Sequence, residues 1–511
     1  MSVPVHSPSA NSAPVILAID QGTTNTKVLL VNGHGEICLS RSRSVPLSYP
    51  RPGWVEQSAE DIWRTVRDLI AEVLTAVPNA AVAAVAISNQ RETVILWDRH
   101  TGAPIAPAVT WQCTRSAERC EQLRKAGKAP LIAQRSGLGI DPLFPAAKIA
   151  GMLDDTPDIR TRAEAGDILC GTVDSWLVWN LTGGAVHATD HSNASRTQLL
   201  NIDTARWDEE LAAVFDVPLA ILPEVRPSDA TFGVICEGFG ALPQGTPVRA
   251  VLGDSHAALF AHDPMASGIV KVTIGTGSSL MVSVPERAES RHALSATIAW
   301  SREDSGVQYA LEGNISVSGH AAAFAAELMG LPDAHALSAV AGQVANSNGV
   351  VFVPALAGLG APHWQTDARG TIMGMSLATR PAHLARATLE AIAHQICDVI
   401  EAMEGDLHHP FPSVTIDGGA GRNSLLAQIL ADLSGKEIVQ APQEESSAVG
   451  AALMAAAAIG IAGSADRAPA QQFMPQISEG DRTNARQQWK RAIAQVTAAA
   501  SPNAAPASVA A

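Results

Sequence analysis

Hydroxyl-bearing residues follow the first apolar strand of the chain, where they could hold a phosphate group. Residues 15–19 read as a strand and residues 28–31 as the next one, with Gly22, Thr23 and Thr24 in the turn between them. Gly22 would let the turn approach a ligand closely, while backbone N–H groups and the two threonine hydroxyls would point at anionic oxygens. The same residues also suit an ordinary hairpin turn, so this segment alone does not decide between a phosphate site and a simple turn.

Carboxylates stand where two predicted strands end. Asp20 follows the first strand and would suit the water shell of a Mg²⁺ ion, which prefers one or two carboxylates together with substrate phosphates. Asp254 follows the strand at residues 248–252 and precedes an alanine-rich helix through Phe260. It could accept the proton of a substrate hydroxyl while that oxygen attacks a γ-phosphate, although the same residue could simply cap the helix. Asp254 is therefore our candidate catalytic base.

The turn with glycine and hydroxyl groups occurs again in the second half of the chain. The strand at residues 269–274 runs into Gly-Thr-Gly at 275–277, and another strand-like run follows at residues 280–284. Further on, a glycine-rich loop at residues 417–421 follows a short strand, and Asn423 would cap the next helix. One phosphate loop in each half predicts a duplicated fold that holds a nucleotide between its halves. Neither loop has the sequence of a Walker loop or of a dinucleotide-binding loop.

Polar residues at the end of another buried strand could bind a small polyol. The strand at residues 81–87 is followed by Arg91 and Glu92, which could fork onto vicinal hydroxyl groups, the arginine donating and the glutamate accepting. Trp111 could stack its ring against the carbon chain of such a ligand. A surface ion pair and a core aromatic residue are the ordinary alternatives for these positions.

A large α/β protein would be needed to position these groups. At 511 residues the chain fits two domains. Ser58 begins a capping-box-like start of a helix that carries an apolar stripe through Val77. The net charge of −15 argues against a nucleic-acid surface. Six scattered cysteines without Cys-x-x-Cys spacing favour a reduced cytoplasmic protein, and no apolar run is long enough to span a membrane.

Ordered segments throughout the chain resemble the glycerol kinases of the FGGY carbohydrate kinase family, from about residue 15 to about residue 497. The matching segments are Asp-Gln-Gly-Thr-Thr at 20–24, Pro-Gly-Trp-Val-Glu at 52–56, Asn-Gln-Arg-Glu-Thr at 89–93, Trp-Gln-Cys at 111–113, Gly-Thr-Val-Asp-Ser-Trp-Leu at 171–177, Asn-Ala-Ser-Arg-Thr at 193–197, Leu-Pro-Glu-Val at 222–225, Gly-Thr-Gly at 275–277, Gly-Leu-Gly-Ala-Pro at 358–362 and Asp-Gly-Gly-Ala at 417–420. The resemblance implies ATP-dependent phosphorylation of a terminal hydroxyl of a small polyol, most simply of glycerol to glycerol 3-phosphate, with Mg²⁺.

The resemblance also implies an α/β fold of the actin and Hsp70 type, a duplicated ribonuclease H-like ATPase fold with a cleft between two domains. We expect a flexible leader at residues 1–14, domains at 15–262 and 263–465, a helical extension at 466–497 and a disordered tail at 498–511. The first domain would carry the polyol site, the first phosphate loop and the base, and the second would carry the other phosphate loop and the adenosine site. Assembly as a homodimer or a homotetramer is left open.

Individual residues receive roles from the same resemblance. Nucleotide contacts fall on Thr23, Thr24, Asn25, Lys27, Thr276, Gly319, Ala323, Gly419 and Asn423. Substrate contacts fall on Arg91, Glu92, Trp111, Leu143, Asp254, Ser255 and Ser279. Asp254 would be the base, and Asp20 would bind Mg²⁺ through water.

Three substrate positions depart from the glycerol kinase pattern. Leu143 stands where those kinases have tyrosine, Ser255 where they have glutamine and Ser279 where they have phenylalanine. These changes remove a hydroxyl, shorten an amide and remove an aromatic wall, so they predict a roomier pocket of different polarity. We expect glycerol as the substrate, with a longer alditol or ketose such as erythritol, threitol, xylitol or xylulose as the alternative. Two other positions also depart from the pattern. Gly245 stands where some relatives have an arginine that binds a regulator, and Ala323 stands where relatives have a polar nucleotide contact.

A different class of protein on the same fold is an ATPase switch or a non-catalytic polyol sensor. A switch would turn over ATP without any polyol, and a sensor would bind a polyol without forming product. The combination of Arg91, Glu92 and Trp111 argues against the switch, and the intact carboxylates Asp20 and Asp254 argue against the sensor.

Overall fold

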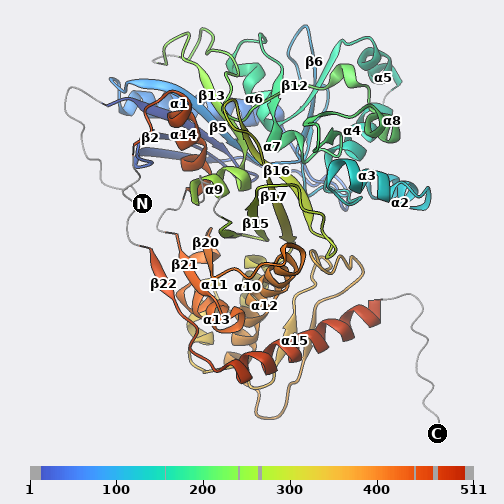
Figure 1. Ribbon diagram of the computed structural model, residues 1–511, viewed down its shortest axis with the longest axis vertical. Coiled ribbons are helices and arrows are strands. Elements are labelled where there is room, and N and C mark those ends of the chain that lie inside the picture. Colours follow the sequence, from blue (N-terminus) through green and yellow to red (C-terminus); the bar gives the residue numbers. More distant parts are fainter. Residues whose placement is uncertain are drawn as a thin grey trace.

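The first half of the chain is built around a five-stranded sheet with helices on both faces (Figure 1). The computed structural model describes residues 13–155, 157–239, 242–262, 268–441, 445–463 and 470–500. The strand order is β13-β5-β1-β2-β3, formed by Val248–Gly253, Val82–Asn89, Val15–Gln21, Asn25–Asn32 and Ile37–Ser44. β1 and β2 form the expected antiparallel hairpin, whereas β5 is parallel to both β1 and β13. The carboxyl ends of β1, β5 and β13 therefore meet at one edge, which brings Asp20, Asp254 and the segment after β5 together.

Alternate residues of β1 face two different helix layers, as a strand period of two requires. Leu17 and Ile19 lie in a core with α1 and α6, whereas Ile16 and Ala18 lie in a core with α9 and α14. These helices are α1 (Ala59–Ala76), α6 (Val173–Leu181), α9 (Asp254–His262) and α14 (Ser446–Ala458). The expected cap of α1 is confirmed, because the Ser58 side chain accepts the N–H of Asp61.

The second half is built around a seven-stranded sheet of similar design. Its order is β16-β17-β15-β14-β20-β21-β22, formed by Ser295–Arg302, Gly306–Ile315, Ser278–Val284, Val270–Ile274, Ser413–Asp417, Glu437–Gln440 and Gln471–Phe473. As in the first sheet, β14 and β15 form an antiparallel hairpin around a glycine turn, and β20 runs parallel to β14. The helices packed in its core are α10 (Gly319–Leu328), α11 (Ala334–Ala341), α12 (Pro381–Leu407) and α13 (Ser424–Ser434). The predicted duplication is therefore present.

A small four-stranded sheet in the first half determines where the predicted polyol residues lie. Its order is β4-β7-β6-β8, formed by Glu56–Gln57, Ala108–Val109, Val94–Asp98 and Ile168–Thr172. Because β6 joins this sheet and not the sheet of β5, residues 90–93 cross from one sheet to the other. Arg91 and Glu92 lie in this crossing, and Glu92 has a left-handed backbone with φ of 60°.

The remaining elements surround these sheets. In the first half they are α2 (Ala117–Lys125), α3 (Ala129–Ser136), α4 (Pro145–Asp154), α5 (Pro157–Glu164), β9 (Ala188–Asp190), α7 (His191–Ala194), β10 (Leu200–Asn201), β11 (Arg206–Trp207), α8 (Glu209–Phe215), η1 (Leu219–Ile221) and β12 (Glu224–Arg226). In the second half they are β18 (Val351–Val353), β19 (Thr371–Met373), η2 (Ala420–Arg422) and α15 (Glu479–Ala500).

Helices α9 and α14 connect the two halves. In Figure 1 the red helix α14 lies among the blue strands of the first sheet, although it belongs to the second half by sequence. Gly450 of α14 meets the backbone of α9, because a Cβ atom at this position would lie 1.8 Å from the carbonyl oxygen of Ala257. The boundary predicted at residue 262 falls beside residues 263–267, which lie outside the described residues.

The C-terminal segment differs in part from the expected helical extension at 466–497. Residues 471–473 form β22 at the edge of the second sheet, and α15 runs on to Ala500, so the tail predicted from residue 498 begins inside a helix. Residues 1–12 of the leader and 501–511 of the tail lie outside the described residues. Within the described part of the chain, no helix is both long and apolar enough to cross a membrane.

Replacing Gly450 by alanine should separate α9 from α14. We expect Gly450→Ala to lower the free energy of unfolding by about 1 to 3 kcal/mol, because the new methyl group would overlap the backbone of Ala257. The control is Gly151→Ala in helix α4, where a Cβ atom would meet nothing within 4 Å and where alanine should instead stabilise by about 0.5 to 1 kcal/mol. Denaturant unfolding measures both changes, and equal effects would contradict the close contact.

Candidate active site

The predicted base, Asp254, is the first residue of α9 and follows β13 directly. Its Oδ1 lies 3.3 Å from Arg91 Nε and accepts the N–H of Ser255 at 2.6 Å. A helix N-cap accepts from a residue two or three positions on, so this geometry does not match the capping alternative. Burial raises the pKa of Asp254 and the Arg91 guanidinium opposes this rise. The side chain keeps 37% exposure, which leaves room for a hydroxyl group to approach it.

Four buried charges form an ionic network next to this carboxylate. Arg91 Nη2 donates to Glu312 Oε1 at 2.7 Å, and Arg196 bridges Glu312 Oε2 and Glu92 Oε1 at 2.8 Å each. Their side chains are between 0% and 7% exposed. Burial alone would raise the pKa of Glu312, but the Arg196 and Arg91 guanidiniums outweigh it and hold this pKa well below its usual range. Because Glu312 lies on β17 of the second sheet, the network joins the two halves of the chain.

Two polar groups at this network could contact a ligand. The Ser279 hydroxyl donates to Glu312 Oε1 at 3.0 Å, so this predicted substrate residue also contacts the network. Arg91 Nη1 is buried and has no hydrogen-bond partner among the described residues. A buried guanidinium N–H that lacks an acceptor can donate to a ligand hydroxyl.

The other predicted substrate residues lie on neighbouring elements of the first half. The indole Nε1 of Trp111 donates to Thr23 Oγ1 at 2.8 Å, which connects the polyol residues to the first phosphate loop. Leu143 is half-buried in the turn before α4, and its backbone carbonyl and that of Trp111 accept from the same lysine, Lys148. Ser255 is the half-buried second residue of α9.

Both predicted phosphate loops are tight turns with accessible side chains. In the first, Gly22 N–H donates to the carbonyl of Asn25 at 2.9 Å, and Thr24 and Asn25 are exposed. In the second, Gly275 N–H donates to the carbonyl of Gly277 at 2.8 Å, and Thr276 between them is exposed. The α10 helix is anchored to this second loop, since Gly319 N–H donates to the Gly275 carbonyl at 2.9 Å and a Cβ at Gly319 would lie 2.4 Å from that oxygen.

Asp20 is suited to hold a cation. It lies at the end of β1, where Ser88 Oγ donates to its Oδ1 at 2.9 Å. Burial raises the pKa of Asp20 to about 7, with Lys27 opposing the rise and Glu445 and Asp254 adding to it. A bound Mg²⁺ would offset the free-energy cost of burying the ionised carboxylate of Asp20. The described residues contain no cluster of three or more metal-ligating side chains.

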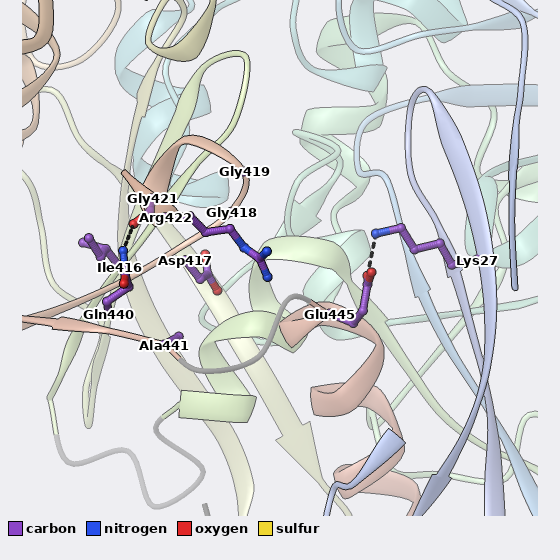
Figure 2. Close-up of a pocket in the computed structure, with 10 residues that line it drawn as sticks. All are labelled: Lys27, Ile416, Asp417, Gly418, Gly419, Gly421, Arg422, Gln440, Ala441 and Glu445. Atoms are coloured by element: carbon purple, nitrogen blue, oxygen red, sulfur yellow. Dashed lines mark hydrogen bonds and ion pairs between the residues drawn. The ribbon is translucent and has the colours of Figure 1, made fainter. Parts of the chain in front are cut away.

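A cavity of about 250 Å³ lies between the first hairpin and the glycine-rich loop that follows β20 (Figure 2). Lys27 reaches it from β2, and Gly419 lines its opposite wall. Lys27 Nζ pairs with Glu445 Oε2 at 2.5 Å, so a second ion pair joins the two halves of the chain, on the side of the cavity away from the Gly419 loop. Its backbone-lined wall and single lysine suit a nucleotide.

Of the nine predicted nucleotide residues, Lys27 and Gly419 line this cavity and the other seven do not. Asn423 caps α13 by accepting the N–H groups of Leu425 and Leu426, and its amide donates to Ser338 Oγ at 2.6 Å. Ala323 is exposed on α10. The structural role of Asn423 was the one expected for it from the sequence alone.

Sequence reasoning missed three charged residues of the site. Arg196 lay within a matching segment but received no role, and Glu445 had no local signal. Glu312 did have one, because it is a single carboxylate that directly follows two apolar residues, Ala310 and Leu311, in a strand. Such a charge is almost always paired when buried.

Comparisons with known proteins agree with this geometry. Residues 15–261 match the model of the N-terminal domain of the FGGY family of carbohydrate kinases, and residues 270–459 match that of its C-terminal domain. The apulose kinase of Pectobacterium atrosepticum is 43% identical over 94% of this chain and 98% of its own length. The glycerol kinase of Desulfitobacterium hafniense is 41% identical over 94% of this chain and 99% of its own. The crystal structure of Plasmodium falciparum glycerol kinase with ADP superposes with a TM-score of 0.89 at 29% identity, covering 95% of this chain and 98% of the other.

Two similar halves, each with a glycine-containing hairpin, have the two-domain actin and Hsp70 type of fold that was predicted. The chain belongs to the FGGY family of carbohydrate kinases. It is accordingly an ATP-using phosphotransferase with an alcohol acceptor.

Removing the central carboxylate of the network should cost stability. We expect Glu312→Gln to lower the free energy of unfolding by about 3 to 5 kcal/mol, because it leaves two buried guanidiniums without their shared counter-charge. The control Glu72→Gln breaks an exposed pair with Arg43 and should cost about 0.5 kcal/mol or less. Denaturant unfolding compares the two, and a cost at Glu312 no larger than at Glu72 would overturn this account of the network.

The Lys27–Glu445 pair should compete with nucleotide phosphates for the lysine. We expect Lys27→Met to raise the KM for ATP about tenfold and Glu445→Gln to lower it, because the second variant frees the ammonium group. Initial rates at varied ATP measure both, with the KM for the alcohol substrate as the internal control. A rise of the ATP KM in both variants would show that the pair holds the loop in place and does not compete with ATP.

Proposed function

We propose that the enzyme transfers the γ-phosphoryl group of ATP to a terminal hydroxyl of a small polyol, with glycerol as the first candidate. The observation that carries the proposal is the pairing of Asp254 with Arg91, whose buried Nη1 has no partner among the described residues. Asp254 could accept the proton of the reacting hydroxyl of a polyol. The free N–H of the adjacent Arg91 could donate to the neighbouring hydroxyl of the same molecule.

The residues of the predicted substrate site would have different roles in the reaction. Arg91 and Glu92 would orient the polyol hydroxyls, Trp111 would cover the carbon chain, and Asp254 would accept the proton of the attacking hydroxyl. The ionic network keeps Arg91 and Glu92 in place, so little reorganisation is needed when the substrate binds.

Phosphate binding would involve both halves. The exposed Thr24, Asn25 and Thr276 and the turn amides would contact the phosphates, and Asp20 would hold Mg²⁺ through water. The ion supplies charge neutralisation at the transferred group when it is bound. We further propose that the adenosine lies in the cavity at Gly419, and that the enzyme works in the cytoplasm, where its six free thiols would stay reduced.

A longer polyol or ketose is the second candidate substrate. Leu143, Ser255 and Ser279 are smaller or less polar than the residues of the glycerol kinase pattern, and a relative 43% identical is an apulose kinase. These positions would leave space beyond a three-carbon chain. Domain boundaries at 262 and 465 and assembly as a homodimer or homotetramer remain predictions.

Product formation with a polyol panel tests the proposal. ADP release with Mg²⁺ is measured for glycerol, dihydroxyacetone, erythritol, threitol, xylitol and xylulose, with Asp254→Asn as the control. We expect glycerol to give the highest kcat/KM and the variant to lose activity by about a hundredfold or more. A longer compound that is better by about tenfold, or about 1.4 kcal/mol in the transition state, would favour the second candidate. ATP turnover without any acceptor, or binding without product, would favour the switch or the sensor.

A further inference from the structure

Lys148 is a buried cation beneath the predicted polyol pocket. It lies on α4 and has no exposed surface, and its Nζ donates to three backbone carbonyls. These belong to Leu143 at 2.7 Å, Thr110 at 2.9 Å and Trp111 at 3.3 Å. An ammonium group has three donors, so all three are used.

The three carbonyls belong to two segments that are far apart in sequence. Thr110 and Trp111 follow β7 of the small sheet, whereas Leu143 lies in the turn that leads into α4. Trp111 also donates from its indole to Thr23 in the first phosphate loop. One ammonium group therefore connects both predicted walls of the polyol pocket, and through Trp111 it is connected to the phosphate loop.

The free-energy cost of burying Lys148 without a carboxylate partner indicates a role other than stabilising the fold. No carboxylate pairs with Lys148 Nζ among the ion pairs of the described residues, and burial lowers the pKa of this lysine to about 7. An apolar side chain of similar length would fill the space without the desolvation penalty of a cation. What such a side chain could not do is hold three carbonyl oxygens at fixed positions.

We propose that Lys148 is the positioning residue of the polyol pocket: by holding the backbone of Trp111 and Leu143, it sets the separation of the two walls and thereby the polyol that fits. This inference rests on the proposed function of the site. Lys148 touches neither substrate nor nucleotide, so it acts only through the residues it holds.

The substitution Lys148→Met tests this role against a purely structural one. We expect the KM for the preferred polyol to rise about tenfold or more while the KM for ATP changes by less than about twofold, because only the polyol walls lose their anchor. Discrimination among the polyols of the panel should also weaken. Lys148→Arg, which keeps donors for the carbonyls, should recover part of the lost affinity.

The matched control is Ile149→Ala on the next residue of the same helix. Ile149 is buried in the core under α4, and its loss should destabilise the protein by removing apolar contacts without touching the three carbonyls. We therefore expect a lower Tm with an unchanged polyol KM. Equal polyol KM values for Lys148→Met and the wild type, or a rise equal to that of Ile149→Ala, would overturn the inference.

The pH dependence of the wild-type enzyme gives a test that needs no folded variant. As the pH rises through about 7, Lys148 loses its third donor, so the polyol KM should rise while the ATP KM does not follow it. The titratable groups that face Lys148 are Glu92, Asp141, Cys113 and Cys120. A polyol KM that stays constant across this range would contradict the positioning role.

Failure of this inference can be told from failure of the proposed function. If the wild type phosphorylates none of the polyols, the proposed function falls and this inference falls with it. If the wild type is active and the Lys148 variants keep its polyol KM, only this inference is wrong.

Discussion

The structure of the site depends on four charges buried between the two sheets. Arg91, Glu92 and Arg196 come from the first half and Glu312 comes from β17 of the second, so neither half can form this network alone. Two cations and two anions balance, and each guanidinium keeps a carboxylate within 2.8 Å. Because an unpaired buried charge costs several kcal/mol, any movement of one sheet against the other is penalised at this point.

Two other contacts join the halves, and they differ in kind. The α9–α14 contact is a close approach of backbones at Gly450, where there is no side chain to adjust. The Lys27–Glu445 pair lines one side of the cavity proposed for the nucleotide, and its side chains are 29% and 16% exposed, so water can replace either partner. The two halves are thus joined by one rigid contact, one buried ionic network and one exchangeable ion pair, and only the last lines the cavity.

Two of the residues that depart from the glycerol kinase pattern, Ser279 and Leu143, also form hydrogen bonds with buried charged side chains. Ser279, a predicted substrate residue, donates to Glu312, which in turn accepts from Arg91. Leu143, another predicted substrate residue, offers its carbonyl to Lys148. If these two positions contact the substrate as proposed, specificity there would depend on the backbone and the buried charges as well as on side-chain size.

The sequence by itself determined the local structure: the two glycine hairpins, the caps at Ser58 and Asn423 and the strand ends that carry Asp20 and Asp254. These features follow from periodicity and from hydrogen bonds between residues a few positions apart, so they can be predicted without knowing the rest of the fold.

Only the tertiary structure decided which charges meet. Arg91 and Glu312 are 221 positions apart and Lys27 and Glu445 are 418 apart. The packing of α14 against the first sheet also could not be predicted from local sequence, because the spacing of apolar residues in a helix does not show which surface that helix will cover. Which charged residues pair across such sequence separations is decided by the packing of the sheets, because a buried charge is tolerated only where the packing places a charge of opposite sign beside it.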